Sequence, residues 1–126
     1  MSKKLKLCLV IALGVAAVAI AWPQSAPDPL DSLVVCAGTQ RLILENAFVR
    51  VIDDSIPAGV SEPRHHHRHS VVVYLSDYTL QQTTDDGQTT VQQRKADTAA
   101  WSEAIVHSLK NIGKTPSHAI RIELKF

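Results

Sequence analysis

Four histidines lie within six residues near the middle of the chain, in the run 64–69 (RHHHRH). A neutral imidazole is a ligand for zinc, iron, nickel and copper, and it exchanges a proton near neutral pH. On a β-strand alternate side chains share a face, so His65, His67 and His69 would point one way and His66 the other. Two imidazoles on one face make half of a metal site, and a third ligand must come from elsewhere in the chain.

Two other interpretations of the run 64–69 remain open. A stretch of histidine and arginine is also typical of a solvated loop that titrates near pH ~6.5. A His-rich tract can also hold metal loosely at the surface. His107 opens another expected strand and is the candidate third ligand of an ordered site.

Four further side chains are weaker candidates. His69 is either an additional ligand or a residue at the rim of the site, and we favour the rim. Glu103 lies four residues before His107 and is either its partner or, as we favour, a solvated carboxylate. Tyr74 ends a strand and either donates a proton in the site or packs. His118 is either a residue at the edge of the site or, as we favour, a packed, hydrogen-bonded histidine.

The segments that must position these residues are mostly β. Short runs rich in β-branched and aromatic residues predict strands at 41–45, 48–52, 71–75, 78–84, 89–94, 99–102, 107–111 and 120–126. Residues 85–87 (DDG) predict a hairpin turn. The segment 30–37 fits either a short helix or a short strand, and no helical period follows it. Many short strands separated by turns indicate a β-sandwich or a β-barrel.

Composition limits the classes of function. The chain has 126 residues, 45% of them hydrophobic and 20% charged, which fits one globular domain. A net charge of +1 and an aromatic content of 5% argue against a nucleic-acid partner. Of the two cysteines, Cys8 lies in the N-terminal apolar segment, so Cys36 has no partner for an intrachain disulfide and is expected to be a small buried hydrophobe.

The N-terminus has the pattern of a secretory signal. Three lysines precede an uncharged run at 7–21, which is shorter than the ~20 residues that a spanning helix needs and ends in small residues. We predict a signal peptide at 1–21, cleaved after Ala21, and a periplasmic or secreted protein with no membrane contact after cleavage. An uncleaved anchor is the alternative. A linker at 22–40 would then precede one β domain at 41–126.

The spacing of the candidate ligands resembles that of the cupin superfamily. Gly59, five residues and then His65-x-His67 resemble the opening of the first cupin motif, G(X)5HXH. His107, three residues and Asn111 resemble the end of the second motif. The resemblance covers roughly residues 42–126. It implies an all-β fold, namely a single cupin-type, jelly-roll-like antiparallel β-barrel, and a homodimer.

Carried over to this chain, the resemblance implies a metal held by His65, His67 and His107. The acid of the first motif falls on Val71 or Val72, neither of which can bind metal. The chain therefore keeps at most a three-histidine site, which is similar to that of the thiol dioxygenases among the cupins. The implied cofactor is one divalent transition metal: iron, zinc, nickel or manganese.

Three functions are compatible with these patterns. The first is an exported metal-binding cupin with dioxygenase-like or other activity on a small polar molecule held in the barrel. The second is a metal-free cupin that binds a small molecule or is purely structural. The third is metal capture at the protein surface by the run 64–69. The sequence names neither the metal nor the substrate, because three imidazoles accept several metals and the fold supports several reactions.

Overall fold

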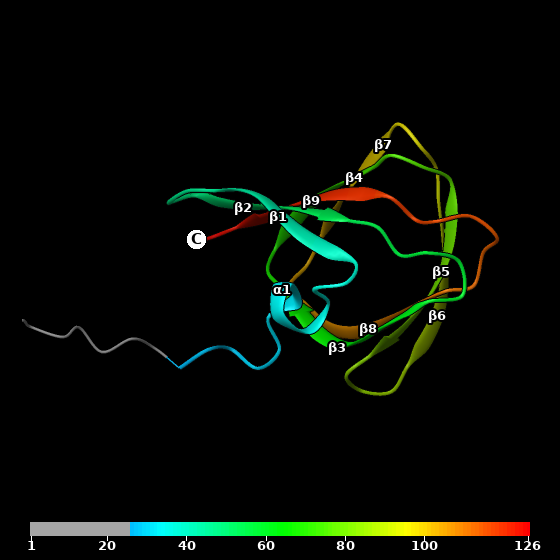
Figure 1. Cartoon of the computed structure of the whole chain (residues 1–126), viewed down its shortest axis with the longest axis horizontal. Helices are drawn as coiled ribbons and strands as arrows, with labels where there is room; N and C mark the ends of the chain where they lie inside the picture. The colour runs from blue at the N-terminus through cyan, green and yellow to red at the C-terminus, as the bar shows by residue number, and fades with distance from the viewer. Residues whose placement is uncertain (1–25) are drawn as a thin grey trace, which may run out of the picture.

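The computed structural model describes residues 26–126, so the predicted signal peptide at 1–21 and its cleavage site lie outside the described residues. Within residues 26–126 the chain forms one short helix, α1 (Ser32–Val35), and nine strands (Figure 1). The strands are β1 (Gln40–Glu45), β2 (Val49–Asp54), β3 (Ser61–His67), β4 (Ser70–Tyr74), β5 (Tyr78–Thr84), β6 (Thr89–Arg94), β7 (Thr98–Ser102), β8 (Ile105–Asn111) and β9 (Ala119–Leu124). No helix in this part of the chain is long and apolar enough to span a membrane.

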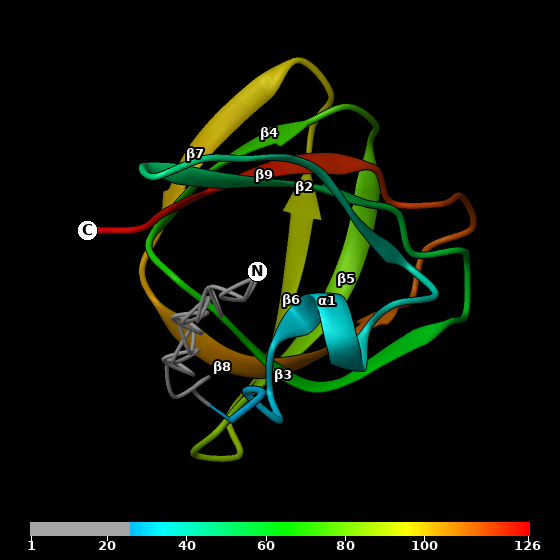
Figure 2. The same cartoon turned by 60° about the vertical axis from the view of Figure 1, so that its left-hand side comes forward.

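The strands form two antiparallel sheets that face each other. One sheet has the order β1-β2-β9-β4-β7 and the other has the order β3-β8-β5-β6. In Figures 1 and 2 the sheet with β2, β9 and β4 lies above β3 and β8, and the β5–β6 hairpin closes one side between them. Strands far apart in the sequence pair in both sheets, as in a jelly roll. The prediction of an all-β, jelly-roll-like antiparallel barrel is confirmed.

Local sequence explains most of the strand boundaries. The hairpin β5–β6 has the predicted bounds, and Gly87 in its turn has a φ of +84°, a conformation that favours glycine. Strands β4, β7 and β8 differ from the predicted ranges by one or two residues at their ends. Such differences are normal where strands fray into turns, and they do not change which residues face the interior.

The segment 30–37, for which helix and strand were both open, contains the helix α1. The side chain of Asp31 caps this helix by accepting a hydrogen bond from the Leu33 amide at 2.9 Å. The helix lies against β3, where the His66 amide donates to the Leu30 carbonyl at 2.9 Å. The chain before β1 therefore contacts the strand that carries His65, His66 and His67.

The last strand shows which of its faces lies inside the barrel. Apolar and charged residues alternate along β9, and the structure buries the charged side chains Arg121 and Glu123. Ile122 and Leu124 point outward and are partly exposed. The buried apolar core is small and falls into two clusters, one made of Ile56, Leu80 and Leu109 and the other of Val72, Tyr74 and Ala119. Polar groups occupy much of the remaining interior, and burying them is costly unless each finds a partner.

Candidate metal centre

The structure brings the three predicted ligands together. Strand β3 pairs with β8 so that His65 lies opposite His107, and His67 follows two residues later on the same face. The three side chains are almost completely buried, with 0%, 2% and 3% of the residue surface exposed for His65, His67 and His107. The distances between the ring centroids are 4.7, 4.8 and 5.5 Å. We call these residues the three-histidine cluster.

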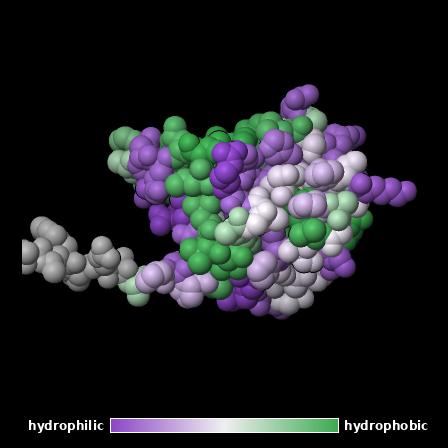
Figure 3. All heavy atoms as spheres, viewed as in Figure 1, coloured by the Kyte–Doolittle hydropathy of each residue, from purple (hydrophilic) through white to green (hydrophobic). Residues whose placement is uncertain are grey.

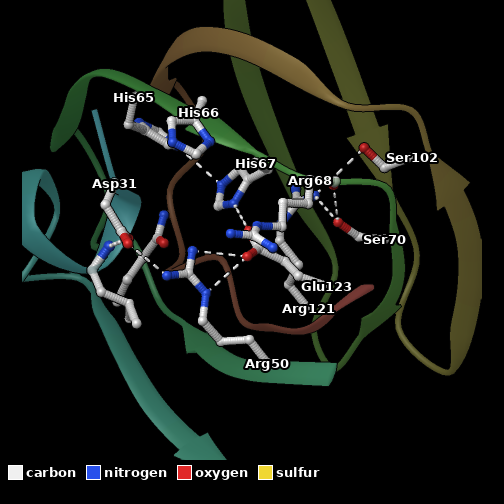
Figure 4. Close-up of polar contacts among 12 residues, drawn as sticks. Asp31, Arg50, His65, His66, His67, Arg68, Ser70, Ser102, Arg121 and Glu123 are labelled. Atoms are coloured by element: carbon white, nitrogen blue, oxygen red, sulfur yellow. Dashed lines mark hydrogen bonds and ion pairs between the residues drawn. The ribbon is translucent and has the colours of Figure 1, made fainter. Parts of the chain in front are cut away.

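Hydrogen bonds orient two rings of the cluster. The Nδ1–H of His67 donates to Glu123 Oε1 at 2.7 Å, as Figure 4 shows. The Nδ1–H of His107 donates to Gln82 Oε1 at 3.0 Å. Because a carboxylate oxygen and an amide oxygen only accept, the proton of each neutral ring lies on Nδ1. The lone pair of each ring is therefore on Nε2, which is free to bind a metal.

The third ring is oriented in the same way. The Nδ1–H of His65 donates to the Pro63 carbonyl at 2.7 Å, and Cys36 Sγ lies 3.3 Å from the same nitrogen. The Nε2 atoms of His65 and His67 are only 3.1 Å apart. Two nitrogens that both carry a lone pair repel each other at this distance, and a cation between them would relieve the repulsion.

The third Nε2 atom of the cluster, that of His107, also lacks a favourable partner. The Nε2 of His107 is buried and has no hydrogen-bond partner among the described residues. A buried polar atom without a partner costs about 1–3 kcal/mol. One ligand nitrogen from each of the three histidines lies within 4.8 Å of the others. Three convergent nitrogens, each with its other ring nitrogen fixed, fit a bound divalent transition metal.

Burial keeps the cluster neutral. It lowers the pKa of His65, lowers the pKa of His67 well below its usual range, and lowers the pKa of His107 to about 2. Burial has this effect because it disfavours the charged imidazolium. A histidine must be unprotonated to bind metal, so all three rings are ready for coordination at neutral pH.

A buried ion-pair network holds Glu123 in place. Arg50 donates from Nε to Glu123 Oε2 at 2.9 Å, its Nη2 lies 2.8 Å from the same oxygen in an ion pair, and its Nη1 donates to Asp31 Oδ2 at 2.7 Å (Figure 4). Glu123 thus accepts a hydrogen bond from Arg50 on one oxygen and from His67 on the other. Because Asp31 caps α1, the network connects the helix to the cluster. Neither Arg50 nor Glu123 was singled out from the sequence.

A second carboxylate borders the cluster. Glu62 Oε2 lies 3.7 Å from His65 Nε2, and the carboxylate is held by Gln40 Nε2 at 3.1 Å and by the hydroxyl of Thr39. Strict alternation along β3 would place Glu62 on the opposite face from His65. The pairing of β3 with β8 shifts register between these two residues, around Pro63, and this irregularity turns Glu62 inward. Glu62 thus places a carboxyl group beside the cluster, which Val71 and Val72 cannot do.

The other histidines of the run 64–69 lie outside the cluster. His66 faces away, as predicted, and its Nε2 contacts Asp28 Oδ2 at 2.5 Å. His69 lies at the rim, where its ring stacks on Trp101 and its Nδ1 lies 2.9 Å from Glu103 Oε2. Glu103 is mostly exposed and pairs with His69 rather than with His107. His66 therefore has the predicted outward orientation, and Glu103 contacts His69 and Trp101 instead of His107.

The last sequence candidates also have clear positions. His118 is partly exposed, and its Nε2 lies 2.8 Å from Asp53 Oδ1. Tyr74 is buried and packs against Tyr78 with ring centroids 5.9 Å apart. Cys36 is a buried free thiol, as expected, and burial raises its pKa to about 12.

A cavity of about 280 Å³ lies inside the barrel beside the cluster. His107 and its partner Gln82 form part of its wall, together with Asp54, Tyr74 and Arg121. A larger groove of about 510 Å³ lies outside the barrel, along residues 66–69 and the C-terminal residues. The interior cavity is lined by both His107 and Gln82, the donor and the acceptor of the hydrogen bond that fixes the His107 ring, so it is the candidate ligand pocket.

Comparisons with known proteins agree with this fold. The sequence matches no protein-family model and no curated protein. Among solved structures, a cupin domain from Bordetella pertussis Tohama I superposes with a TM-score of 0.64 at 24% identity, over 69% of this chain and 92% of that one. An RmlC-like cupin family protein with a double-stranded β-helix fold from Methanocaldococcus jannaschii gives 0.54 at 14% identity, over 68% and 77% of the two chains. At these identities the likeness shows a cupin-type fold and nothing further.

Proposed function

We propose that this protein is a metal-dependent cupin that binds one divalent transition metal through the Nε2 atoms of His65, His67 and His107. The observation that carries the proposal is the convergence of three buried, unprotonated Nε2 atoms, two of them 3.1 Å apart. Each ring donates its Nδ1–H to a fixed oxygen acceptor, the arrangement expected of metal-binding histidines.

A competing donor set shares one of these histidines. Cys36, Glu62 and His65 also present ligand atoms within 4.8 Å of one another. A thiol binds metal as the thiolate, and burial raises the pKa of Cys36 to about 12. The neutral imidazoles need no such deprotonation, so the three-histidine cluster is the favoured site.

When bound, the metal supplies Lewis acidity or, in the case of iron, dioxygen chemistry. The residues of the chain would hold and orient the ligands of such a metal. Glu123 and Gln82 fix the rings of His67 and His107, and the burial of these rings keeps bulk water from them. Three neutral ligands leave the full +2 charge on the metal, which favours an anionic or polarisable group at the open positions. The reaction expected is a dioxygenase-like or Lewis-acid reaction on a small polar molecule in the interior cavity.

Metal content of variants tests the proposed site. Wild-type protein purified without immobilised metal, stripped with chelator and titrated with Zn²⁺ in a calorimeter should bind one equivalent. His107→Ala should abolish this binding, whereas the matched variant His66→Ala should retain it. Full binding by the His107 variant would place the metal elsewhere, and no binding by the wild type would favour a metal-free cupin.

We also propose that the protein is exported. The lysines and the apolar run of residues 1–21 support a cleaved signal peptide and a periplasmic or secreted location. Intact-mass measurement of the exported fraction should give a chain that begins at Trp22. A full-length chain in the membrane fraction would instead support an uncleaved anchor.

We further propose a homodimer that forms through the outer face of the five-stranded sheet. Cross-strand pairing aligns Leu44, Val51, Ile122, Val71 and Trp101 in one apolar row across all five strands. Hydrophobic residues gather over β2 and β9 in Figure 3. A second copy of the same face would cover this row, since large apolar patches are uncommon on monomers.

A further inference from the structure

Arg121 is a buried cation with few contacts. Only 9% of the residue is exposed, and its side chain lies inside the barrel on β9. Its Nη1 is 3.3 Å from Ser70 Oγ and 3.4 Å from Ser102 Oγ, as Figure 4 shows. Its Nε is buried without a partner, and within residues 26–126 the side chain makes no ion pair. A guanidinium has five N–H groups, so most of its donors are unused.

The nearby acids do not neutralise Arg121. Glu123 is occupied by Arg50 and His67. Asp54 interacts with Arg121 electrostatically, but burial, reinforced by Glu62, raises the pKa of Asp54 to about 8. Burial therefore disfavours the charged form of Asp54, and its Oδ1 has no hydrogen-bond partner among the described residues. Burying an unpaired charge is expensive, so a protein retains one where a ligand supplies the counter-charge.

The unused donors of Arg121 and the free Nε2 of His107 belong to residues that line the same cavity. The cavity measures about 280 Å³, which equals about nine water molecules at about 30 Å³ each. Tyr74 and Tyr78 form apolar parts of its wall. The cavity thus combines a cation, an apolar surface and the edge of the candidate metal centre.

We propose that Arg121 is the anion-binding residue of this cavity and that the ligand is a small molecule carrying a carboxylate. The carboxylate contacts the guanidinium of Arg121, and the rest of the ligand lies along the tyrosines toward His107. The charges match, because one carboxylate balances one guanidinium and accepts two parallel hydrogen bonds from it. The orientation toward His107 rests on the proposed function, whereas the carboxylate contact requires no metal.

A second arginine in the cavity wall is already satisfied. Arg94 lies over the Tyr74 ring at 5.2 Å from its centroid, and its Nη2 donates to Gln92 Oε1 at 2.8 Å. It is also only partly buried, so water solvates its charge. Arg94 therefore provides a matched control for Arg121.

The test measures carboxylate binding by calorimetry on metal-free and Zn²⁺-treated protein. The probes are acetate, butyrate and benzoate, each compared with its neutral amide. At least one carboxylate should bind about tenfold or more tightly than its amide. Arg121→Met should lose that preference, Arg121→Lys should lose about tenfold because it cannot form the bidentate contact, and Arg94→Met should stay within about twofold of wild type.

Three outcomes would overturn the inference: no preference for any carboxylate, an unchanged preference in Arg121→Met, or a loss of the preference in Arg94→Met alone. If Arg121→Met fails to fold, as judged by circular dichroism, Arg121→Lys decides the matter. The two proposals fail separately. Carboxylate binding through Arg121 without any Zn²⁺ binding would refute the metal centre alone, and Zn²⁺ binding without the carboxylate preference would refute the Arg121 site alone.

Discussion

Acid should destabilise the metal-free protein through its buried histidines, and His107→Gln isolates one of them. Burial lowers the pKa of folded His107 to about 2, whereas an unfolded histidine titrates near 6.5. Below pH ~6.5 the unfolded chain therefore binds a proton at His107, whereas the folded chain does not. By linkage, the stability contributed through His107 is present above pH ~6.5 and is lost as pH falls toward 2.

The size of this loss follows from the two pKa values. Each pH unit below ~6.5 costs about 1.4 kcal/mol for one such group. Between pH 7.5 and 4.5 the wild type should lose about 2.7 kcal/mol through His107, and His107→Gln should lose nothing through this position. Other groups titrate equally in both proteins, so the quantity to compare is the difference between their free energies of unfolding.

Urea unfolding in the presence of chelator, at pH 7.5, 5.5 and 4.5, measures that difference. His118→Gln is the control, because it removes a histidine that is partly exposed and lies outside the cluster. The control should not reproduce the change expected of His107→Gln. A constant difference between wild type and His107→Gln at all three pH values would show that His107 is not held neutral, and the argument for a ready metal ligand would fail.

Four further predictions follow from the same contacts. Glu123→Gln should weaken Zn²⁺ binding about 10- to 100-fold in calorimetry, because His67 loses a charged acceptor, and unchanged affinity would contradict its orienting role. Zn²⁺ should be retained in dialysis at pH 6 and released only under more acidic conditions, since burial lowers the pKa of the cluster, and release at pH 6.5 would contradict this. Asp54→Asn should stabilise the protein at pH 7.5 by on the order of a few kcal/mol. Folding raises the pKa of this carboxyl, so the wild type loses stability as pH rises from ~4 to about 8, and the amide does not. Equal urea midpoints for the wild type and the variant at pH 7.5 would refute this prediction. In sedimentation, the wild type should be a dimer and Ile122→Lys should be a monomer, and a monomeric wild type would refute the proposed dimer.

The fold could be predicted because its signals are local. Alternating residues, the DDG turn and β-branched runs define strands without knowledge of their partners. The three-histidine cluster could be predicted because His65 and His67 are two residues apart on one strand, while the resemblance to the cupin motifs supplied His107 from another strand.

The rest of the site depends on tertiary structure. Glu62 could not be placed, because the register shift between Glu62 and His65 breaks the alternation that sequence reasoning assumes. Arg121 and Glu123 are two residues apart and so share one face of a strand, but an isolated strand gives no indication that this charged face lies inside. That assignment depends on Arg50 from β2 and on the partners in the opposite sheet, and neither is visible in local sequence.

The most direct test of the metal centre is X-ray absorption at the metal edge of Zn²⁺-loaded, untagged protein. The three-histidine cluster predicts one metal per chain with three nitrogen neighbours at about 2.0–2.1 Å, and the outer-shell scattering that imidazole rings produce. A sulfur neighbour at about 2.3 Å would instead place the metal on Cys36, Glu62 and His65. That result, or a first shell without imidazole, would contradict a metal held by His65, His67 and His107.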